Sequence, residues 1–98
     1  MYARVSTYEG TSEDYDRGLE TMKSELMPKV RELQGYKGLL SLVDRSTGKS
    51  LTIALYDSED AMSSAAKAAE GLRKDAASTT GSSVANVVEY EVGVADLP

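Results

Sequence analysis

Few side chains in this sequence are able to carry out chemistry. The chain has 98 residues and contains no histidine and no cysteine, so the commonest acid–base group and the thiol nucleophile are both missing. The zinc, dithiol and nucleotide-binding patterns HExxH, CxxC, P-loop and GxGxxG are also absent from it. We therefore weigh mainly tyrosine, arginine and carboxylate side chains as functional candidates, and we expect neither a metal nor an organic cofactor.

Arg4 is the most informative charged residue, because residues 2–8 alternate in polarity as a half-buried strand does. An arginine that points inward from a strand needs a carboxylate, an anionic ligand or water as its partner. Glu89 or Glu91 can supply that carboxylate if the first and last strands share a sheet. We favour such a structural ion pair, and binding of a ligand anion by Arg4 is the alternative.

Two acidic groups could be mistaken for metal-binding clusters. Each follows a residue that can cap a helix, and carboxylates are stabilised at the positive N-terminal end of a helix. The groups are Glu13, Asp14 and Asp16 after Thr11 or Ser12, and Asp57, Glu59 and Asp60 around Ser58. In the same way, Arg73 and Lys74 are expected near the C-terminal end of a helix, where cations are favoured. We therefore predict no metal site.

The elements that position these residues begin with the strand at 2–8 and a helix over residues 15–33. In that helix apolar residues recur every three or four positions, which is typical of a helix that faces a core. Pro28 falls inside the pattern, so we expect the helix to kink or restart near Met27. Gly35 should end it.

The second half of the chain predicts two further strands, a helix and a last strand. The two strands, Tyr36–Asp44 and Leu51–Tyr56, are joined by a polar hairpin turn that contains Gly48. Ser58 can cap the helix, whose inner stripe is mostly small residues: Ala61, Met62, Ala65, Ala68 or Ala69, and Leu72. A loop at 78–83 then leads to a strand from Val84 to Val94. The order β-α-β-β-α-β predicts an α+β ferredoxin-like fold with a four-stranded antiparallel sheet, in a single domain over residues 1–98.

Both helices of this fold pack on one face of the sheet, so the other face must be polar or covered. We expect that open face to mix tyrosines with polar residues: Tyr2, Tyr8, Tyr56, Tyr90, Arg4, Ser6, Thr52 and Asn86. A one-residue slip in register would move Tyr36, Asn86 and Tyr90 to the other face. Such a surface suits a small-molecule pocket or a subunit interface, and a sheet-to-sheet homodimer would provide both. The pocket candidates are Arg4, Ser6, Tyr8, Tyr56, Asn86 and Tyr90.

Composition narrows the choice of partners. The net charge is −5 and the pI is about 4.6, and lysine and arginine are dispersed along the chain. Nucleic acid and anionic membranes are therefore disfavoured, because phosphate binding depends on clustered positive charge. The first residues lack the pattern of a signal peptide, and no apolar run approaches the ~20 residues of a membrane span. We expect a cytoplasmic protein.

Three segments together resemble the antibiotic biosynthesis monooxygenase-like (ABM) superfamily. They are the Gly-aromatic-x-Gly motif at residues 35–38, the stretch LTIALYDSEDA at residues 51–61, and the last-strand segment at residues 85–92. The resemblance implies a dimeric α+β barrel in which two sheets enclose a pocket in each subunit. The superfamily includes cofactor-free oxygenases that act on aromatic polyketides, as well as haem-degrading enzymes.

Some residues depart from that family pattern. Tyr56 stands where family members often carry tryptophan, and the chain has no histidine to ligate haem. Quinone-forming members are associated with a pocket asparagine, and Asn86 is the only asparagine here. The resemblance implies a homodimer that binds a small hydrophobic or aromatic molecule, as a cofactor-independent monooxygenase. The alternative is a non-catalytic ligand-binding or stress-related module on the same fold.

Two other classes of function share the predicted arrangement of strands and helices. Regulatory amino-acid-binding domains of this fold usually work attached to an enzyme, whereas we expect this chain to act alone. RNA-binding domains use basic and aromatic strands, but this chain is acidic and has no phenylalanine. Both classes are therefore weaker interpretations than the two above.

Overall fold

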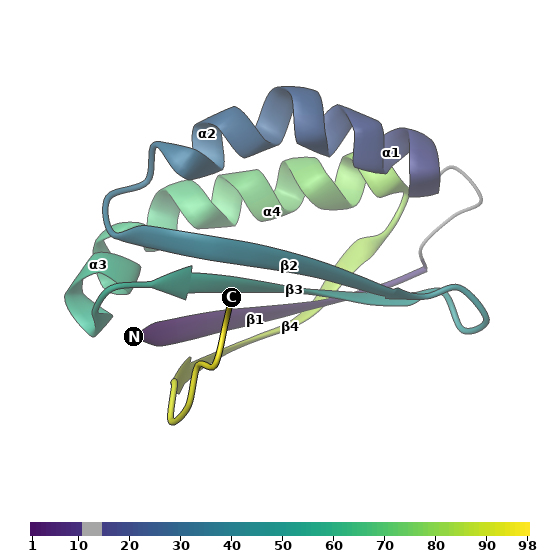
Figure 1. The fold of residues 1–98 in the computed structure, drawn as a ribbon. Helices are drawn as coiled ribbons and strands as arrows, with labels where there is room; N and C mark the ends of the chain where they lie inside the picture. The colour runs from purple at the N-terminus through teal and green to yellow at the C-terminus, as the bar shows by residue number, and fades with distance from the viewer. Residues whose placement is uncertain (11–14) are drawn as a thin grey trace.

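The computed structural model describes residues 1–10 and 15–98 of the chain. Four strands form one antiparallel sheet in the order β2-β3-β1-β4 (Figure 1). These strands are β1 (Tyr2–Glu9), β2 (Tyr36–Asp44), β3 (Lys49–Tyr56) and β4 (Ser83–Glu91). The helical segments lie on one side of the sheet, which gives the molecule two layers (Figure 1). They are α1 (Tyr15–Thr21), η1 (Met22–Leu26), α2 (Met27–Arg31), α3 (Glu59–Ser64) and α4 (Ala66–Thr80).

This order of elements confirms the predicted ferredoxin-like fold, and several local predictions hold as well. Gly48 in the β2–β3 hairpin has a φ of 74°, in the left-handed region that the turn requires. The Ala61 N–H donates to Ser58 Oγ at 3.1 Å, so Ser58 caps α3 as expected. The predicted first-helix cap, with Glu13 and Asp14, lies outside the described residues.

The first helical region contains the predicted interruption at Pro28, in a form that the sequence pattern did not show. η1 is a π-helical turn, in which the Met27 N–H donates to the carbonyl of Met22. Pro28 follows in the first turn of α2, where its missing N–H costs little. The restart at Met27 is thus confirmed. The wider π-helical turn before it supplies one wall of the cavity described below.

The second helical region is longer than predicted, and this corrects two expectations. α4 continues to Thr80 and ends at Gly81, whose φ is 69°. The N–H groups of Gly81 and Ser82 cap the free carbonyls of the last turn, which is the Schellman arrangement. The expected loop therefore begins three residues later than 78. Arg73 also lies in the middle of α4 and not at its C-terminal end, so the helix dipole does not explain it.

The register of the strands shows which side chains share a face. Arg4 pairs with Ala54 of β3 and with Glu89 of β4, whereas Val5 pairs with Ile53 and Val88. The even-numbered residues of β1 point toward the helices, where they line a cavity with side chains of α4 and the first helical region. The odd-numbered residues therefore point to the open face.

The predicted composition of the open face is wrong for most of its residues. Six of the eight lie on the helix side of the sheet: Tyr2, Arg4, Ser6, Tyr8, Thr52 and Tyr56. Asn86 and Tyr90 do lie on the open face, because they pair with Thr7 and Ala3. Alternation separates the two sets of a strand but does not say which set meets the helices. The polar residues of β1 were assigned to the open face, although their partners lie on the helix side of the sheet.

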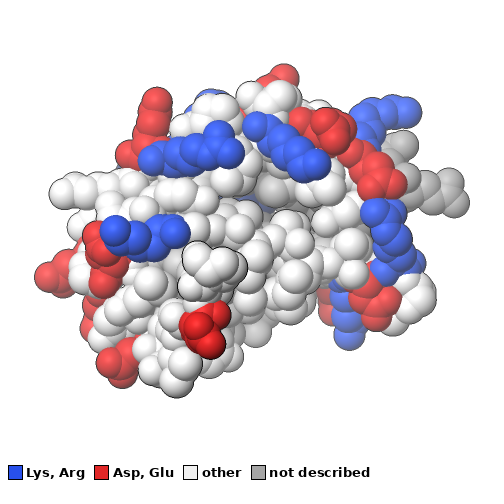
Figure 2. All heavy atoms as spheres, viewed as in Figure 1, with Lys and Arg blue, Asp and Glu red and all other residues white. Residues whose placement is uncertain are grey.

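The open face is apolar instead. Leu40, Leu42 and Tyr90 are 51%, 47% and 55% exposed, and Val5 and Ile53 lie between them on the central strands. Figure 2 shows that charged side chains gather along the helices and at the ends of the molecule, with mostly uncharged atoms over the strands. This face therefore exposes apolar side chains to solvent.

Candidate ligand cavity between the sheet and the helices

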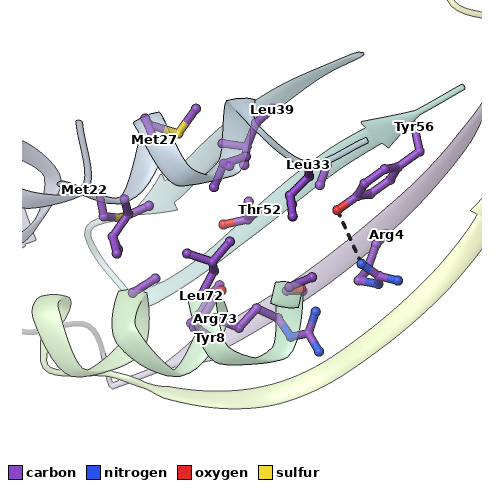
Figure 3. A pocket seen from close by; sticks show the side chains of 16 residues that line it. Arg4, Tyr8, Met22, Met27, Leu33, Leu39, Thr52, Tyr56, Leu72 and Arg73 are labelled. Atoms are coloured by element: carbon purple, nitrogen blue, oxygen red, sulfur yellow. Dashed lines mark hydrogen bonds between the residues drawn. The ribbon is translucent and has the colours of Figure 1, made fainter. Parts of the chain in front are cut away.

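A cavity of about 60 Å³ lies between the sheet and the helices (Figure 3). Its helical walls are apolar, with Met22, Leu26 and Met27 on one side and Leu72 of α4 on the other. The sheet forms its floor. Its polar lining is limited to a few side chains: Arg4, Ser6, Tyr8, Thr52, Tyr56 and Arg73. An apolar cavity with a few convergent polar groups is the usual form of a small-molecule site.

Arg4 lies at one end of the cavity and is only 3% exposed. Its Nε and Nη2 donate to Glu89 Oε2 at 3.3 and 3.0 Å, and Nη2 also donates to the carbonyl of Met62 at 2.8 Å. The predicted structural ion pair is therefore confirmed, with Glu89 as the partner. Because the charge and most donors of Arg4 are satisfied, its burial is tolerated.

Tyr56 completes this polar end. Its side chain is 1% exposed, and its hydroxyl points toward Arg4, whose Nη1 donates to it at 3.4 Å (Figure 3). The guanidinium carbon lies 5.4 Å from the centroid of the Tyr56 ring, which adds a cation–π contact. Because the Tyr56 oxygen accepts from Arg4, the O–H of Tyr56 is free to donate a hydrogen bond to a ligand oxygen.

A second polar group surrounds Tyr8, which is 5% exposed. Burial raises the pKa of the Tyr8 hydroxyl, whereas the hydrogen bond with Thr52 and the positive charge of Arg73 act in the opposite direction. The net pKa remains above its ordinary value, so Tyr8 is protonated at neutral pH and can donate a hydrogen bond. The cavity thus presents one neutral phenol, that of Tyr8, near the positive charge of Arg73.

The structure brings four of the six pocket candidates together around this cavity: Arg4, Ser6, Tyr8 and Tyr56. Asn86 and Tyr90 are on the opposite face of the sheet and do not line it. The antiparallel register explains this, since Arg4 faces Glu89 and the residues at 86 and 90 fall one step out of phase.

Sequence reasoning missed the contributions of the helices, above all Arg73. A signal was present, because Arg73 follows the inner residue Ala69 by four positions and is next to Leu72. It was assigned to a helix end instead. Met22 and Met27 carried no signal beyond their apolar character.

Among residues 1–10 and 15–98, no group of three or more histidine, cysteine or acidic residues lies close enough to hold a metal ion. Nor does any helix in these ranges combine the length and apolar character needed to cross a membrane.

No protein-family model matches the chain. Among curated proteins, it is 29% identical over 86 residues to Rv2557, an uncharacterized protein of Mycobacterium tuberculosis strain H37Rv. The match covers 88% of this chain but 38% of that relative. The chain thus spans less than two fifths of the length of the curated relatives it matches.

The matching solved structures align over more of both proteins than the curated relative does, at lower sequence identity. The chain matches a Streptomyces coelicolor monooxygenase, ActVA-Orf6 in complex with nanaomycin D, with a TM-score of 0.71 and 17% identity. The match covers 99% of this chain and 91% of that protein. SnoaB, a cofactor-independent oxygenase of Streptomyces nogalater, gives a TM-score of 0.67 and 15% identity, over 97% of this chain and 95% of SnoaB. A Deinococcus radiodurans protein assigned to the antibiotic biosynthesis monooxygenases gives a TM-score of 0.67 at 21% identity. That match covers 100% of this chain and 98% of the Deinococcus protein. The structural neighbours thus include ABM-type monooxygenases, and the chain has their ferredoxin-like α+β fold.

Proposed function

We propose that this chain binds a small hydrophobic or aromatic molecule in the cavity between the sheet and the helices, and oxidises an electron-rich phenol there as a cofactor-independent monooxygenase. The observation that supports this proposal is the contact between Arg4 and Tyr56 at one end of an otherwise apolar cavity. A phenol or phenolate oxygen placed at that end would meet a cation and a hydroxyl donor. The cofactor-independent oxygenase SnoaB has the same fold.

The chemistry needs no cofactor if the substrate is itself the reductant. A deprotonated phenol of the anthrone type is electron-rich and can pass electrons directly to O₂. Its methylene carbon loses two hydrogens and gains one oxygen atom as a carbonyl, and the second oxygen atom leaves as water. The side chains at the polar end would stabilise the phenolate, which lowers the energy of the electron-rich form that reacts.

The size of the cavity sets the class of ligand. A volume of about 60 Å³ is less than half of the ~150 Å³ of an apolar cavity that binds benzene, so even a one-ring ligand requires part of the wall to move, and a three-ring ligand requires more. Met22 and Met27 are suited to this, because methionine is unbranched and changes rotamer easily. We therefore expect one-ring phenols to bind with the least rearrangement.

We also propose that the chain forms a homodimer through the open face of its sheet. Leu40 and Leu42 are exposed there on one edge strand, β2, and Tyr90 on the other, β4, and a second copy would remove them from water. The two sheets would then form the α+β barrel that the family resemblance implies. In this arrangement each cavity stays within its own subunit, between the sheet and the helices, and not between the two sheets.

Oxygen consumption with a panel of one-ring phenols and an anthrone tests the catalytic proposal. We expect uptake that depends on the protein and is lost in the Arg4→Ala and Tyr56→Phe variants. Ligand binding is followed in parallel as a rise in melting temperature. If no member of the panel is turned over or raises the melting temperature, the proposed function is wrong.

A non-catalytic binding module is the second candidate, and one contact favours it. Glu89 already neutralises Arg4, so less of the positive charge remains to stabilise a phenolate. The same panel separates the two candidates. Phenols that raise the melting temperature without any oxygen uptake would favour the binding module over the monooxygenase.

A further inference from the structure

Arg73 lies where the cavity opens to the surface. It projects from the middle of α4 and is half-buried. It lines the inner cavity, and it also lines a surface groove of about 760 Å³ whose other residues come from β1, α4 and β4. Arg4 is the other residue common to both spaces. Figure 3 shows the two guanidinium groups on the same side of the cavity, at its α4 and β1 walls.

The two arginines differ in how their charges are compensated. Arg4 pairs with Glu89, and the neighbouring Lys74 of α4 pairs with Glu70 at 3.4 Å. Among the described residues, no carboxylate forms an ion pair with Arg73. The groove as a whole has three cationic residues, Arg4, Lys67 and Arg73, and two acidic ones, Glu70 and Glu89. A single surplus positive charge therefore remains at the mouth.

This surplus affects which ligands can fill the cavity. A ligand that occupies the cavity and covers its mouth removes water from the Arg73 guanidinium. With a neutral ligand, that charge would lose solvation without gaining a partner, which is unfavourable. A carboxylate would replace the water with a charge-assisted hydrogen bond, and the planar guanidinium matches carboxylate geometry. Glu70 and Glu89 nearby would repel a group of higher negative charge.

We propose that the ligand of this cavity is a small aromatic monocarboxylic acid, whose ring lies among the apolar walls and whose carboxylate binds Arg73 at the mouth. This inference rests on the proposed function, which it deepens by naming the class of ligand. The influence of the Arg73 charge on the Tyr8 hydroxyl supports the placement of the guanidinium close to the cavity.

Two phenols that differ only in the acid group test the proposal. They are 4-hydroxyphenylacetate and 4-methylphenol, each titrated by calorimetry into the whole chain at pH 7 and constant ionic strength. We expect the acid to bind the wild-type chain about tenfold more tightly than 4-methylphenol, as a charge-assisted hydrogen bond at a half-buried site would give.

Variants of α4 locate the origin of that preference. Arg73→Gln should bind both phenols equally, and Arg73→Lys should restore part of the preference because it keeps the charge. Lys74→Gln is the matched control, since Lys74 is adjacent on the helix but does not line the cavity, and it should bind as the wild type does. Circular dichroism and thermal unfolding confirm that each variant is folded.

The outcomes separate this inference from the proposed function. If both phenols bind wild type equally, or if Arg73→Gln keeps the preference for the acid, the assignment of Arg73 is wrong while binding in the cavity stands. If neither phenol binds, the proposed function is wrong and this inference is wrong with it.

Discussion

At the residue scale, the polar end of the cavity depends on how completely Arg4 is bonded. Its contacts with Glu89 and the Met62 carbonyl hold the guanidinium in place independently of Tyr56. Among the described residues, the Tyr56 hydroxyl has one hydrogen bond, the long contact of 3.4 Å to Arg4, so we propose it as the group that meets a ligand. In the proposed site, Arg4 would therefore supply a fixed positive charge and Tyr56 the hydrogen-bond donor that is free to meet a ligand oxygen.

Tyr56→Phe tests this division, because it removes the hydroxyl and keeps the ring in the core. We expect the free energy of unfolding to change by less than about 1 kcal/mol, since one long hydrogen bond is lost. Affinity for phenols should fall by about fivefold, because a ligand oxygen loses a donor. Urea denaturation and calorimetry measure the two effects.

Tyr36→Phe is the control for that variant. Tyr36 pairs with Tyr56 across the β2–β3 ladder but does not line the cavity, so the same chemical change there should leave phenol affinity unaltered. If both variants weaken binding equally, the Tyr56 hydroxyl has no specific role.

The ion pair between Asp16 and Arg45 makes a second residue-scale prediction, in the pH dependence of stability. The Arg45 guanidinium donates to both carboxylate oxygens, at 3.2 and 2.8 Å, and lowers the pKa of Asp16 below its ordinary value. A carboxyl whose pKa is lower in the folded chain stabilises the fold at pH values above its unfolded pKa. That contribution disappears as the pH falls through the folded pKa.

Asp16→Asn should therefore be slightly less stable than wild type at neutral pH, and the two should converge in acid. Because the pair is exposed, added salt should also reduce the difference. Thermal unfolding from pH 7 to pH 2 measures this, with Glu20→Gln as the control on the same helix. A difference that persists unchanged at pH 2 would mean that the ion pair is not its cause.

At the element scale, the junction between α2 and β2 depends on Gly35. Its φ is 79°, and its carbonyl accepts from the Asp57 N–H at 2.8 Å, which ties this junction to the end of β3. A methyl group added at Gly35 would collide with the Cβ of Ala61 in α3. The Gly-aromatic-x-Gly motif therefore begins with a residue that both backbone conformation and packing require to be glycine.

Gly35→Ala should destabilise the chain by about 2–3 kcal/mol, from backbone strain together with the displacement of α3. Gly71→Ala is the matched control. Gly71 lies in the interior of α4, and no atom lies within 4 Å of the position of an added Cβ. That substitution should stabilise the helix by about 0.5–1 kcal/mol. Urea denaturation of both variants would refute the steric argument if the two effects had the same sign.

At the scale of the whole molecule, the two faces of the sheet meet different surroundings. The helix side of the sheet encloses the cavity, and the open side exposes apolar side chains that a second copy can cover. Because the two faces belong to the same strands, dimer formation would limit the motion of the strands that line each cavity without contributing residues to it. We therefore expect ligand affinity to be largely retained in a folded monomer.

Leu42→Glu tests the dimer at this scale. Leu42 is 47% exposed on β2, so a carboxylate there is tolerated by a monomer but would be buried in a sheet-to-sheet interface. We expect wild type to sediment as a dimer at micromolar concentration and Leu42→Glu as a monomer. Leu97→Glu, at a residue that is 58% exposed in the C-terminal tail, is the control and should remain a dimer. A monomeric wild type would overturn the proposed interface.

The sequence by itself determined the order of elements, their approximate ends, and the pairing of Arg4 with a glutamate of the last strand. The order and ends of the elements depend on local chemistry: apolar periodicity, helix caps such as Ser58, and glycines at left-handed positions. The pairing of Arg4 follows from the fold that this order predicts. The error at the end of α4 was also local in origin. The Schellman ending of α4 extends the helix beyond its apolar stripe, and no periodic signal marks that extension.

Only the tertiary structure decided which face of the sheet meets the helices, and hence where the candidate site lies. A strand divides its side chains into two sets by alternation, but the choice between them depends on what packs against each set. Ser6 and Tyr8 were expected to line a pocket on the open face, and they are buried beneath α4 and the π-helical turn. Arg73 joins them from a helix more than sixty residues away in the chain. Long-range packing brings such residues together, and no local pattern encodes it.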